Sequence, residues 1–246
     1  MQTLFHLHFA SIDSTQTWAK QHLHELPQEG VSLISAETQT AGRGRFPSRK
    51  WVSPKGMGVY ATFCFFISPT EELRSRLGTL GLVLAFSAAL FLEKNGIFPK
   101  IKWPNDLLVE QKKIGGILVE TTPVEEKWAV LAGLGINLNG EKASFQELQR
   151  PVTSLFLETG RPKKPLDALQ EMQYFFLRNL SLFLQEGFSP FLSSIQERLV
   201  HRKGDLVSLQ LSSQKILGEM VSMLPSGALQ LLVDGIPLSF YSGEME

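Results

Sequence analysis

The most unusual local feature of the sequence is a short loop, Gly42-Arg43-Gly44-Arg45, in which two glycines alternate with two arginines. Glycine lets a backbone approach a ligand closely, and the planar guanidinium group of arginine suits carboxylates and phosphates. The chain as a whole is neutral, with 24 Lys and Arg against 24 Asp and Glu, so the loop is a local concentration of positive charge. It is either an anion-binding loop or a solvated basic loop.

Three further segments bring polar side chains to the beginnings or ends of expected strands. Lys102-Trp103-Pro104-Asn105-Asp106 places an ammonium, an amide and a carboxylate at one strand end, where they could meet phosphate, ribose or a metal ion. Lys112 and Lys113 precede an apolar strand, and Gly133-Leu134-Gly135-Ile136-Asn137 ends another. The alternatives are a plain turn, a hairpin with exposed lysines and close packing of backbones.

Composition excludes several other classes of protein. Neutral charge argues against a dedicated nucleic-acid binder, and no Walker A phosphate loop is present. The single cysteine, Cys64, excludes a disulfide framework and lies in an apolar run, so we expect a buried structural thiol. The longest uncharged stretch, residues 77–92, is shorter than the roughly 20 residues that a membrane-spanning helix needs. We therefore expect a core helix there, no membrane segment and a cytoplasmic location.

The elements that must position these residues follow from hydrophobic periodicity. Strands are expected at residues 4–9, 31–37, 59–66, 107–109, 117–119 and 128–136. One helix is expected after a Ser14 cap, and a second after a Ser68 cap, with Pro69 in its first turn and Gly96 as its terminator. A third should cover residues 165–186 and a short one residues 190–199. The pattern indicates an α+β fold in which helices pack on one side of a mixed or antiparallel sheet.

The character of the sequence changes after residue 201. Short strands are expected at residues 205–211, 216–223, 229–233 and 236–240, separated by turn signals such as Asp234-Gly235. We therefore expect two domains, residues 1–201 and a small all-β module at residues 202–246.

Taken together and in this order, the motifs resemble those of the biotin–protein ligase family. The matching segments are Asp13-Ser14-Thr15-Gln16 and residues 37–45, 51–60, 102–106, 113–120 and 133–137. Two departures are an extra residue between Gly42 and Trp51, and Gln16 in place of the more usual asparagine. The resemblance implies a class II synthetase-like catalytic domain followed by an SH3-like β-barrel. The first motif begins at residue 13, so we expect the short class that lacks the DNA-binding domain of the family's repressors.

The resemblance implies an ATP-dependent ligase that works in two steps. Biotin is first activated as biotinyl-5′-AMP with release of pyrophosphate, and is then transferred to one lysine of a carrier domain. Both first reactants are anions, so positive charge and Mg²⁺ must offset their repulsion. The implied catalytic residues are Lys113, Arg45 and Asp106. Implied biotin-binding residues are Ser14, Thr15, Gln16, Gln39, Arg43, Gly44, Arg45 and Lys113. Implied residues for ATP or the adenylate are Trp51, Lys102, Asn105 and Asn137, and no metal ligand is assigned.

The implied partner is the biotin carrier domain of acetyl-CoA carboxylase or of another biotin-dependent carboxylase, with no DNA and no membrane. The sequence leaves open whether the protein forms a homodimer. Two other functions compete with this one: a lipoate–protein ligase, which shares the fold and the adenylation chemistry, and a non-catalytic biotin-binding protein.

Overall fold

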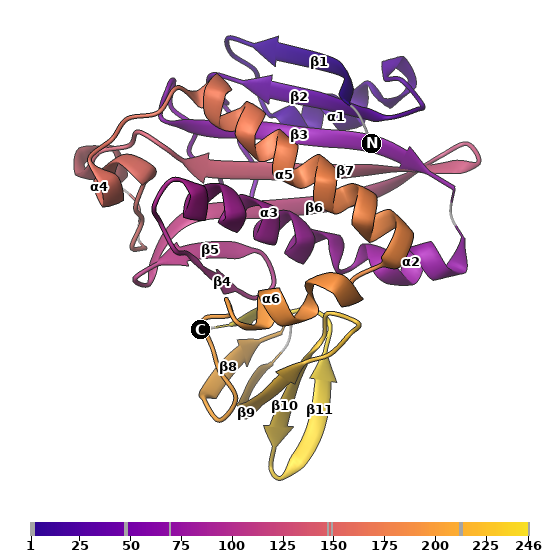
Figure 1. Cartoon of the computed structure of the whole chain (residues 1–246), viewed down its shortest axis with the longest axis vertical. Helices are drawn as coiled ribbons and strands as arrows, with labels where there is room; N and C mark the ends of the chain where they lie inside the picture. The colour runs from indigo at the N-terminus through magenta and orange to yellow at the C-terminus, as the bar shows by residue number, and fades with distance from the viewer. Residues whose placement is uncertain are drawn as a thin grey trace.

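The computed structural model describes residues 3–46, 49–68, 70–146, 148, 150–211 and 214–245. Its centre is a seven-stranded sheet with the strand order β1-β2-β3-β7-β6-β5-β4 (Figure 1). The strands are β1 (Thr3–Phe9), β2 (Val31–Ala36), β3 (Gly58–Ile67), β4 (Lys100–Lys102), β5 (Asp106–Val109), β6 (Lys112–Val124) and β7 (Lys127–Asn137). β1 and β2 are parallel and every other pair is antiparallel, which confirms the predicted mixed sheet.

The two faces of this sheet carry different helices because successive side chains of a strand point to opposite sides. Phe63 of β3 and Ala132 of β7 belong to the main core with α3 (Leu80–Lys94) and α5 (Pro165–Glu186). Their neighbours Cys64 and Leu131 belong to a second cluster beneath α1 (Thr15–Gln21). The expectation of helices on one side only is therefore wrong, whereas the buried thiol of Cys64 is confirmed.

The helical region before residue 96 also differs from expectation. It is divided into α2 (Glu71–Leu77) and α3, which are bent by 52° relative to each other. The cap of α2 is Thr70, whose side chain accepts from the amide of Leu73, and not Ser68. Pro69 lies outside the described residues. The helix ends as predicted, with Gly96 at a φ of 86°.

The remaining helices follow the hydrophobic pattern more closely. α5 covers the predicted residues, with Pro165 in its first turn. The expected short helix is a 3₁₀ turn (Ser189–Phe191) followed by α6 (Leu192–Gln196), and α4 (Leu155–Thr159) was not predicted. Among the described helices, none is by itself long and apolar enough to cross a bilayer. The bent pair α2–α3 reaches that length and composition only when the two helices are counted together, and α3 is mostly buried in the core.

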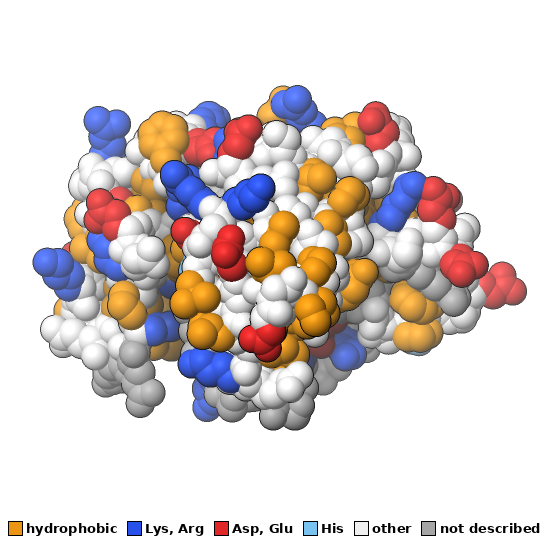
Figure 2. All heavy atoms as spheres, turned by 90° about the horizontal axis from the view of Figure 1, so that it is seen from below, with side chains coloured by type: hydrophobic (Ala, Val, Ile, Leu, Met, Phe, Trp, Pro, Cys, Tyr) orange, Lys and Arg blue, Asp and Glu red, His pale blue; other side chains and the backbone are white. Residues whose placement is uncertain are grey.

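A second, five-stranded antiparallel sheet follows α6 and lies at the lower end of Figure 1. Its strands are β8 (Leu206–Gln210), β9 (Lys215–Met223), β10 (Leu229–Val233), β11 (Ile236–Phe240) and β12 (Glu244–Met245). The first four confirm the predicted strands, and β12 is additional. Figure 2 shows apolar side chains gathered at this end of the molecule, where Leu206, Leu217 and Ile236 are exposed. The domain boundary at residues 201–202 stays a prediction, because the apolar core runs through both sheets.

Candidate functional site

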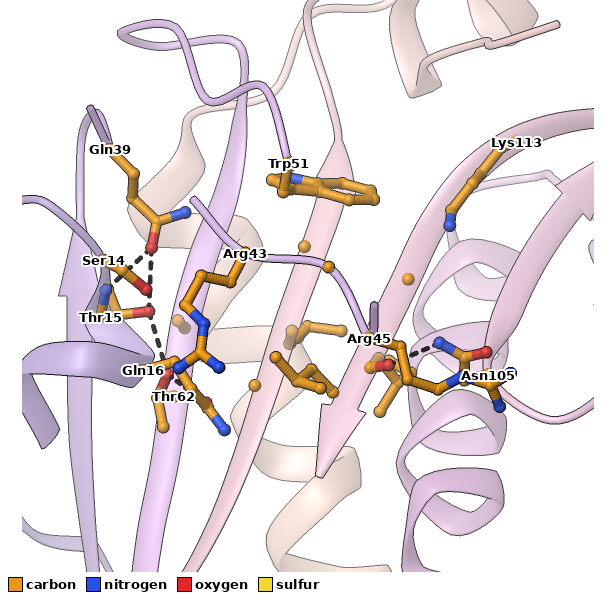
Figure 3. Close-up of a pocket in the computed structure, with 18 residues that line it drawn as sticks. Ser14, Thr15, Gln16, Gln39, Arg43, Arg45, Trp51, Thr62, Asn105 and Lys113 are labelled. Carbon is orange, nitrogen blue, oxygen red and sulfur yellow. Dashed lines mark hydrogen bonds between the residues drawn. The ribbon is translucent and has the colours of Figure 1, made fainter. Parts of the chain in front are cut away.

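The N-terminal end of α1 forms the polar floor of a pocket on the face of the sheet opposite α3 and α5. Ser14 caps the helix, and Thr15 and Gln16 follow it into the pocket. Gln39 Oε1 accepts from the amide of Thr15 at 2.8 Å, and the hydroxyls of Thr15 and Thr62 are 2.9 Å apart. The floor is thus a continuous row of hydroxyl and amide groups (Figure 3).

Two glycines of β7 create the space for this pocket. Each stands on the strand face that points away from the main core. A Cβ atom at Gly133 would lie 2.6 Å from Gln16 Oε1, and one at Gly135 would lie 2.4 Å from the ring of Trp51. The glycines of the Gly133–Asn137 motif therefore let Gln16 and Trp51 pack closely against the sheet, which agrees with the alternative that these glycines serve close packing. The indole Nε1 of Trp51 is buried and finds no hydrogen-bond partner in the described part of the chain.

The glycine–arginine loop lies over the pocket and is held in place at both ends. The amide of Trp51 donates to the carbonyl of Gly42, and that of Gly44 to the carbonyl of Arg49, each at 2.9 Å. Arg45 donates to the carbonyl of Gly243, and Arg49 forms a two-pronged ion pair with Glu244 at 2.5 and 2.9 Å. The C-terminal sheet thus anchors the loop. Pro47 and Ser48, in the longer middle of the loop, lie outside the described residues.

Lys113 stands opposite the floor, at the junction of three pockets. Figure 3 shows Ser14, Thr15 and Gln16 on one side of the first pocket, Lys113 on the other and Trp51 between them. Lys113 Nζ lies 2.5 Å from Asp106 Oδ1, and its side chain is only 12% exposed. Burial lowers the pKa of Lys113, and the carboxylate of Asp106 opposes this shift. The ammonium is therefore held in a poorly solvated position, where its charge acts strongly on a ligand.

The three pockets differ in character. The first, the floor pocket, is lined by the row of hydroxyl and amide groups and by Gly116, Gly133 and Gly135. The second, the cationic pocket, contains six basic side chains and two acidic ones: Arg45, Arg49, Lys50, Lys102, Lys113 and Arg150 against Asp106 and Glu244. The third, the apolar pocket, includes Trp51, Val52, Met57, Tyr60, Phe145, Leu148 and Asn137. A carboxylate, a polyphosphate and an apolar ring could be bound side by side around Lys113.

The structure brings the predicted site residues together. All eight expected biotin-binding residues line the floor pocket. Lys102 and Asn105 line the cationic pocket, Asn137 lines the apolar pocket, and Trp51 lines all three. Asn105 also serves the turn, since its amide donates to the carbonyl of Ile117 at 2.8 Å. The roles assigned to these residues stay predictions.

Sequence reasoning missed three polar residues of the site. Thr62 belongs to the row of hydroxyl and amide groups on the floor. Glu120, the last residue of the Lys113 motif, accepts from Gln16 and from Arg43. Arg150 lines two pockets because the segment after it pairs with Lys113 through a parallel bridge to Val152. The motif ending at Glu120 gave a signal for that residue, whereas nothing in the sequence pointed to Arg150.

Among the described residues, no group of three His, Cys, Asp or Glu side chains could hold a metal ion. The carboxylates of the cationic pocket, Asp106 and Glu244, are paired with Lys113 and Arg49. A divalent cation at this site would therefore depend mainly on oxygen atoms of its ligand, as Mg²⁺ does when it binds with a nucleotide.

Comparisons with known proteins agree with this arrangement. A family model described as the biotin/lipoate A/B protein ligase family matches residues 8–137. The biotin–[acetyl-CoA-carboxylase] ligase of Paracoccus denitrificans is 31% identical over 215 residues, covering 82% of this chain and 84% of the relative. The bifunctional ligase/repressor BirA of Escherichia coli (strain K12) is 32% identical, covering 95% of this chain and 71% of the relative. The bifunctional ligase/repressor BirA of Bacillus subtilis (strain 168) is 34% identical, and the match covers only 54% of its length, so the chain spans about half of this relative.

A solved structure gives the same result for the fold. The biotin protein ligase from Aquifex aeolicus in complex with biotin and ATP is 30% identical and superposes with a TM-score of 0.81, covering 99% of this chain and 98% of that one. The site geometry, the family match and the relatives agree. The chain belongs to the biotin/lipoate A/B protein ligase family, and within it to the biotin–protein ligases.

Proposed function

We propose that this protein activates biotin with ATP and transfers it to a lysine of a biotin carrier domain. The observation that carries the proposal is the position of Lys113, whose ammonium is shared by the floor, cationic and apolar pockets. A carboxylate and a triphosphate repel each other, and a buried cation between them offsets that repulsion. The ATP complex of the Aquifex aeolicus relative supports this choice of reactants.

In this proposal the floor pocket holds biotin. The ureido ring has two N–H donors and one carbonyl acceptor, and the floor offers the hydroxyl and amide groups of Ser14, Thr15, Gln16 and Gln39. The thiophane ring and the valeryl chain would lie along Leu118 and the strand backbone at Gly116, Gly133 and Gly135, which line the same pocket. The carboxylate then points toward Lys113 on the opposite side.

Adenylate formation takes place where the floor and cationic pockets meet. The carboxylate oxygen of biotin attacks the α-phosphorus of ATP, the bond to the bridging oxygen breaks, and pyrophosphate leaves. Lys113 holds attacker and target together, while Lys102, Arg45 and Arg150 bind the negative charge of the phosphates. The adenine ring lies in the apolar pocket against Trp51. Mg²⁺ would enter with the triphosphate and shield its charge, with Asp106 as the nearest carboxylate of the pocket.

Transfer to the carrier follows in the same place. The carrier lysine attacks the carbonyl carbon of the mixed anhydride, and AMP leaves. Asp106 orients this lysine or accepts its proton, and the closed glycine–arginine loop excludes water that would hydrolyse the anhydride. We propose the biotin domain of acetyl-CoA carboxylase as the carrier, since the Paracoccus denitrificans relative is named for that substrate.

Lipoate fits the floor pocket less well than biotin. Its dithiolane ring has neither the N–H donors nor the carbonyl of a ureido group, so it would displace water from the polar floor without forming hydrogen bonds there in return. A pure biotin-binding protein would have no need for the cationic pocket next to the floor.

The direct test is to incubate the protein with ATP, Mg²⁺, biotin and a carrier domain and to measure the carrier's mass. We expect the carrier to gain one biotinyl group, to gain nothing without ATP, and to gain nothing when its acceptor lysine is replaced by arginine. A lipoyl addition in preference to a biotinyl one, or no ATP-dependent addition at all, would refute the proposal.

A further inference from the structure

Glu120 joins the floor of the biotin pocket to the loop that covers it. It lies on β6 and faces the pocket side of the sheet, where its partner on β7 is Leu131. Its Oε2 accepts from Gln16 Nε2 at 3.0 Å, and its Oε1 accepts from Arg43 Nη2 at 3.4 Å. One carboxylate therefore contacts two segments of the site that are far apart in the sequence.

The contact with Gln16 fixes one end of the polar floor. The amide nitrogen of Gln16 also donates to the carbonyl of Leu131 at 3.2 Å, so both of its N–H groups face acceptors. Its oxygen must then face Thr62, whose hydroxyl donates to it at 3.1 Å. Without the acceptor at position 120, one N–H group of this buried amide would lose its partner, and the side chain would be free to turn.

The contact with Arg43 acts on the loop instead of the floor. Arg43 is half-exposed, and among the described residues its guanidinium group forms one ion pair, with Glu120. Lys20, one turn after Gln16 on α1, approaches the same carboxylate oxygen at 3.7 Å and does not line the floor pocket. The charge of Glu120 attracts the loop, whereas its ability to accept a hydrogen bond orients the floor.

We propose that Glu120 is a positioning residue that couples biotin binding on the floor to closure of the glycine–arginine loop. This inference rests on the proposed function, and it divides the side chain's contribution into two parts. Its oxygen toward Gln16 sets the affinity for biotin, and its negative charge toward Arg43 retains the adenylate beneath the loop.

Two variants separate the two parts. Glu120→Gln keeps an acceptor for Gln16 but loses the charge, so the affinity for biotin should stay within about threefold of wild type. Release of preformed biotinyl-adenylate should accelerate by about two- to fivefold, the range expected for loss of a partly exposed ion pair. Glu120→Met removes both functions, so the affinity for biotin should fall by about tenfold as well. A general structural role would affect biotin binding and adenylate release together in both variants.

The experiment measures biotin affinity by calorimetry without ATP, and adenylate release with labelled biotin. Lys20→Met is the matched control, because it removes a cation next to the same carboxylate without touching loop or floor, and it should change neither quantity. Wild-type retention of adenylate by Glu120→Gln, or wild-type biotin affinity in a folded Glu120→Met protein, would overturn the inference. Failure of the wild type to form adenylate would instead count against the proposed function, and the calorimetric comparison would still test the role of Glu120 on the floor.

Discussion

The substitution Lys113→Met tests the residue at the junction of the three pockets. Methionine nearly preserves the length of the side chain and removes its charge. An ammonium about 4 Å from a developing negative charge contributes about 4 kcal/mol at an effective dielectric constant near 20, which corresponds to about three powers of ten in rate. Loss of one preorganised contact to transition-state charge usually costs about 10²–10³ in rate. We therefore expect adenylate formation to slow by about 10²–10³.

The loss should appear in kcat more than in the KM for ATP. Five other basic side chains line the cationic pocket. Among the described cations, only Lys113 borders the floor, cationic and apolar pockets together. The fold should survive, because the side chain of Asp106 is 20% exposed and can be solvated once its partner is gone. The free energy of unfolding should fall by about 1–3 kcal/mol, because a largely buried pair loses one partner.

The assay is biotin-dependent exchange of labelled pyrophosphate into ATP, together with thermal unfolding and calorimetric binding of ATP. Lys112→Met is the matched control: Lys112 is the neighbouring residue on β6, pairs with Glu158 at 2.9 Å and contributes no side chain to the three pockets. We expect the control to exchange pyrophosphate at nearly the wild-type rate. Exchange by Lys113→Met within about fivefold of wild type would refute the role given to this ammonium.

Three further predictions concern its surroundings. Burial lowers the pKa of Lys113, and the protonated form is the active one, so adenylate formation should decline as the pH rises through a pKa below the usual 10.5. Asp106→Asn removes a group that raises this pKa, so the decline in the pH–rate profile of the variant should move to lower pH. An unmoved profile would contradict the pairing of Lys113 with Asp106. Gly135→Ala would place a methyl group 2.4 Å from the ring of Trp51 and displace the ring, so ATP binding measured by calorimetry should weaken about tenfold. An unchanged affinity for ATP would show that the ring does not bind the nucleotide. Glu244→Gln breaks the ion pair of the C-terminal sheet with Arg49 of the glycine–arginine loop, so trypsin should cleave the loop about two- to fivefold faster. Equal cleavage rates of the variant and the wild type would argue against anchoring of the loop by that sheet.

Regular hydrophobic periodicity made much of the fold predictable. The 22-residue helix α5 has its Pro165 start and its apolar stripe visible in the sequence, and the structure reproduces its bounds. The break between α2 and α3 was not predicted, although Gly78, the C-cap residue of α2, stands at it. Thr79 packs against Gly227, where a Cβ atom would lie 2.5 Å from the Thr79 side chain, and its hydroxyl donates to the carbonyl of Arg76.

The site likewise contains residues that local sequence motifs predict and residues that they do not. Residues such as Lys113 and Gln39 lie in motifs whose spacing is read along the chain, and the structure brings them into one pocket. Arg150 and Thr62 reach the site only through strand pairing, Arg150 by the bridge beside Lys113 and Thr62 by its register opposite Gly133. Pairing between distant segments leaves no local pattern, so these two residues could not be found from the sequence.

A crystal structure with biotin and a non-hydrolysable ATP analogue tests the central claim most directly. We expect the ureido ring to bind Ser14, Thr15 and Gln16, the biotin carboxylate to lie within hydrogen-bonding distance of Lys113 Nζ, and the triphosphate to occupy the cationic pocket. Biotin bound elsewhere, or its carboxylate turned away from Lys113 with both ligands present, would contradict the claim that this ammonium brings the two anions together.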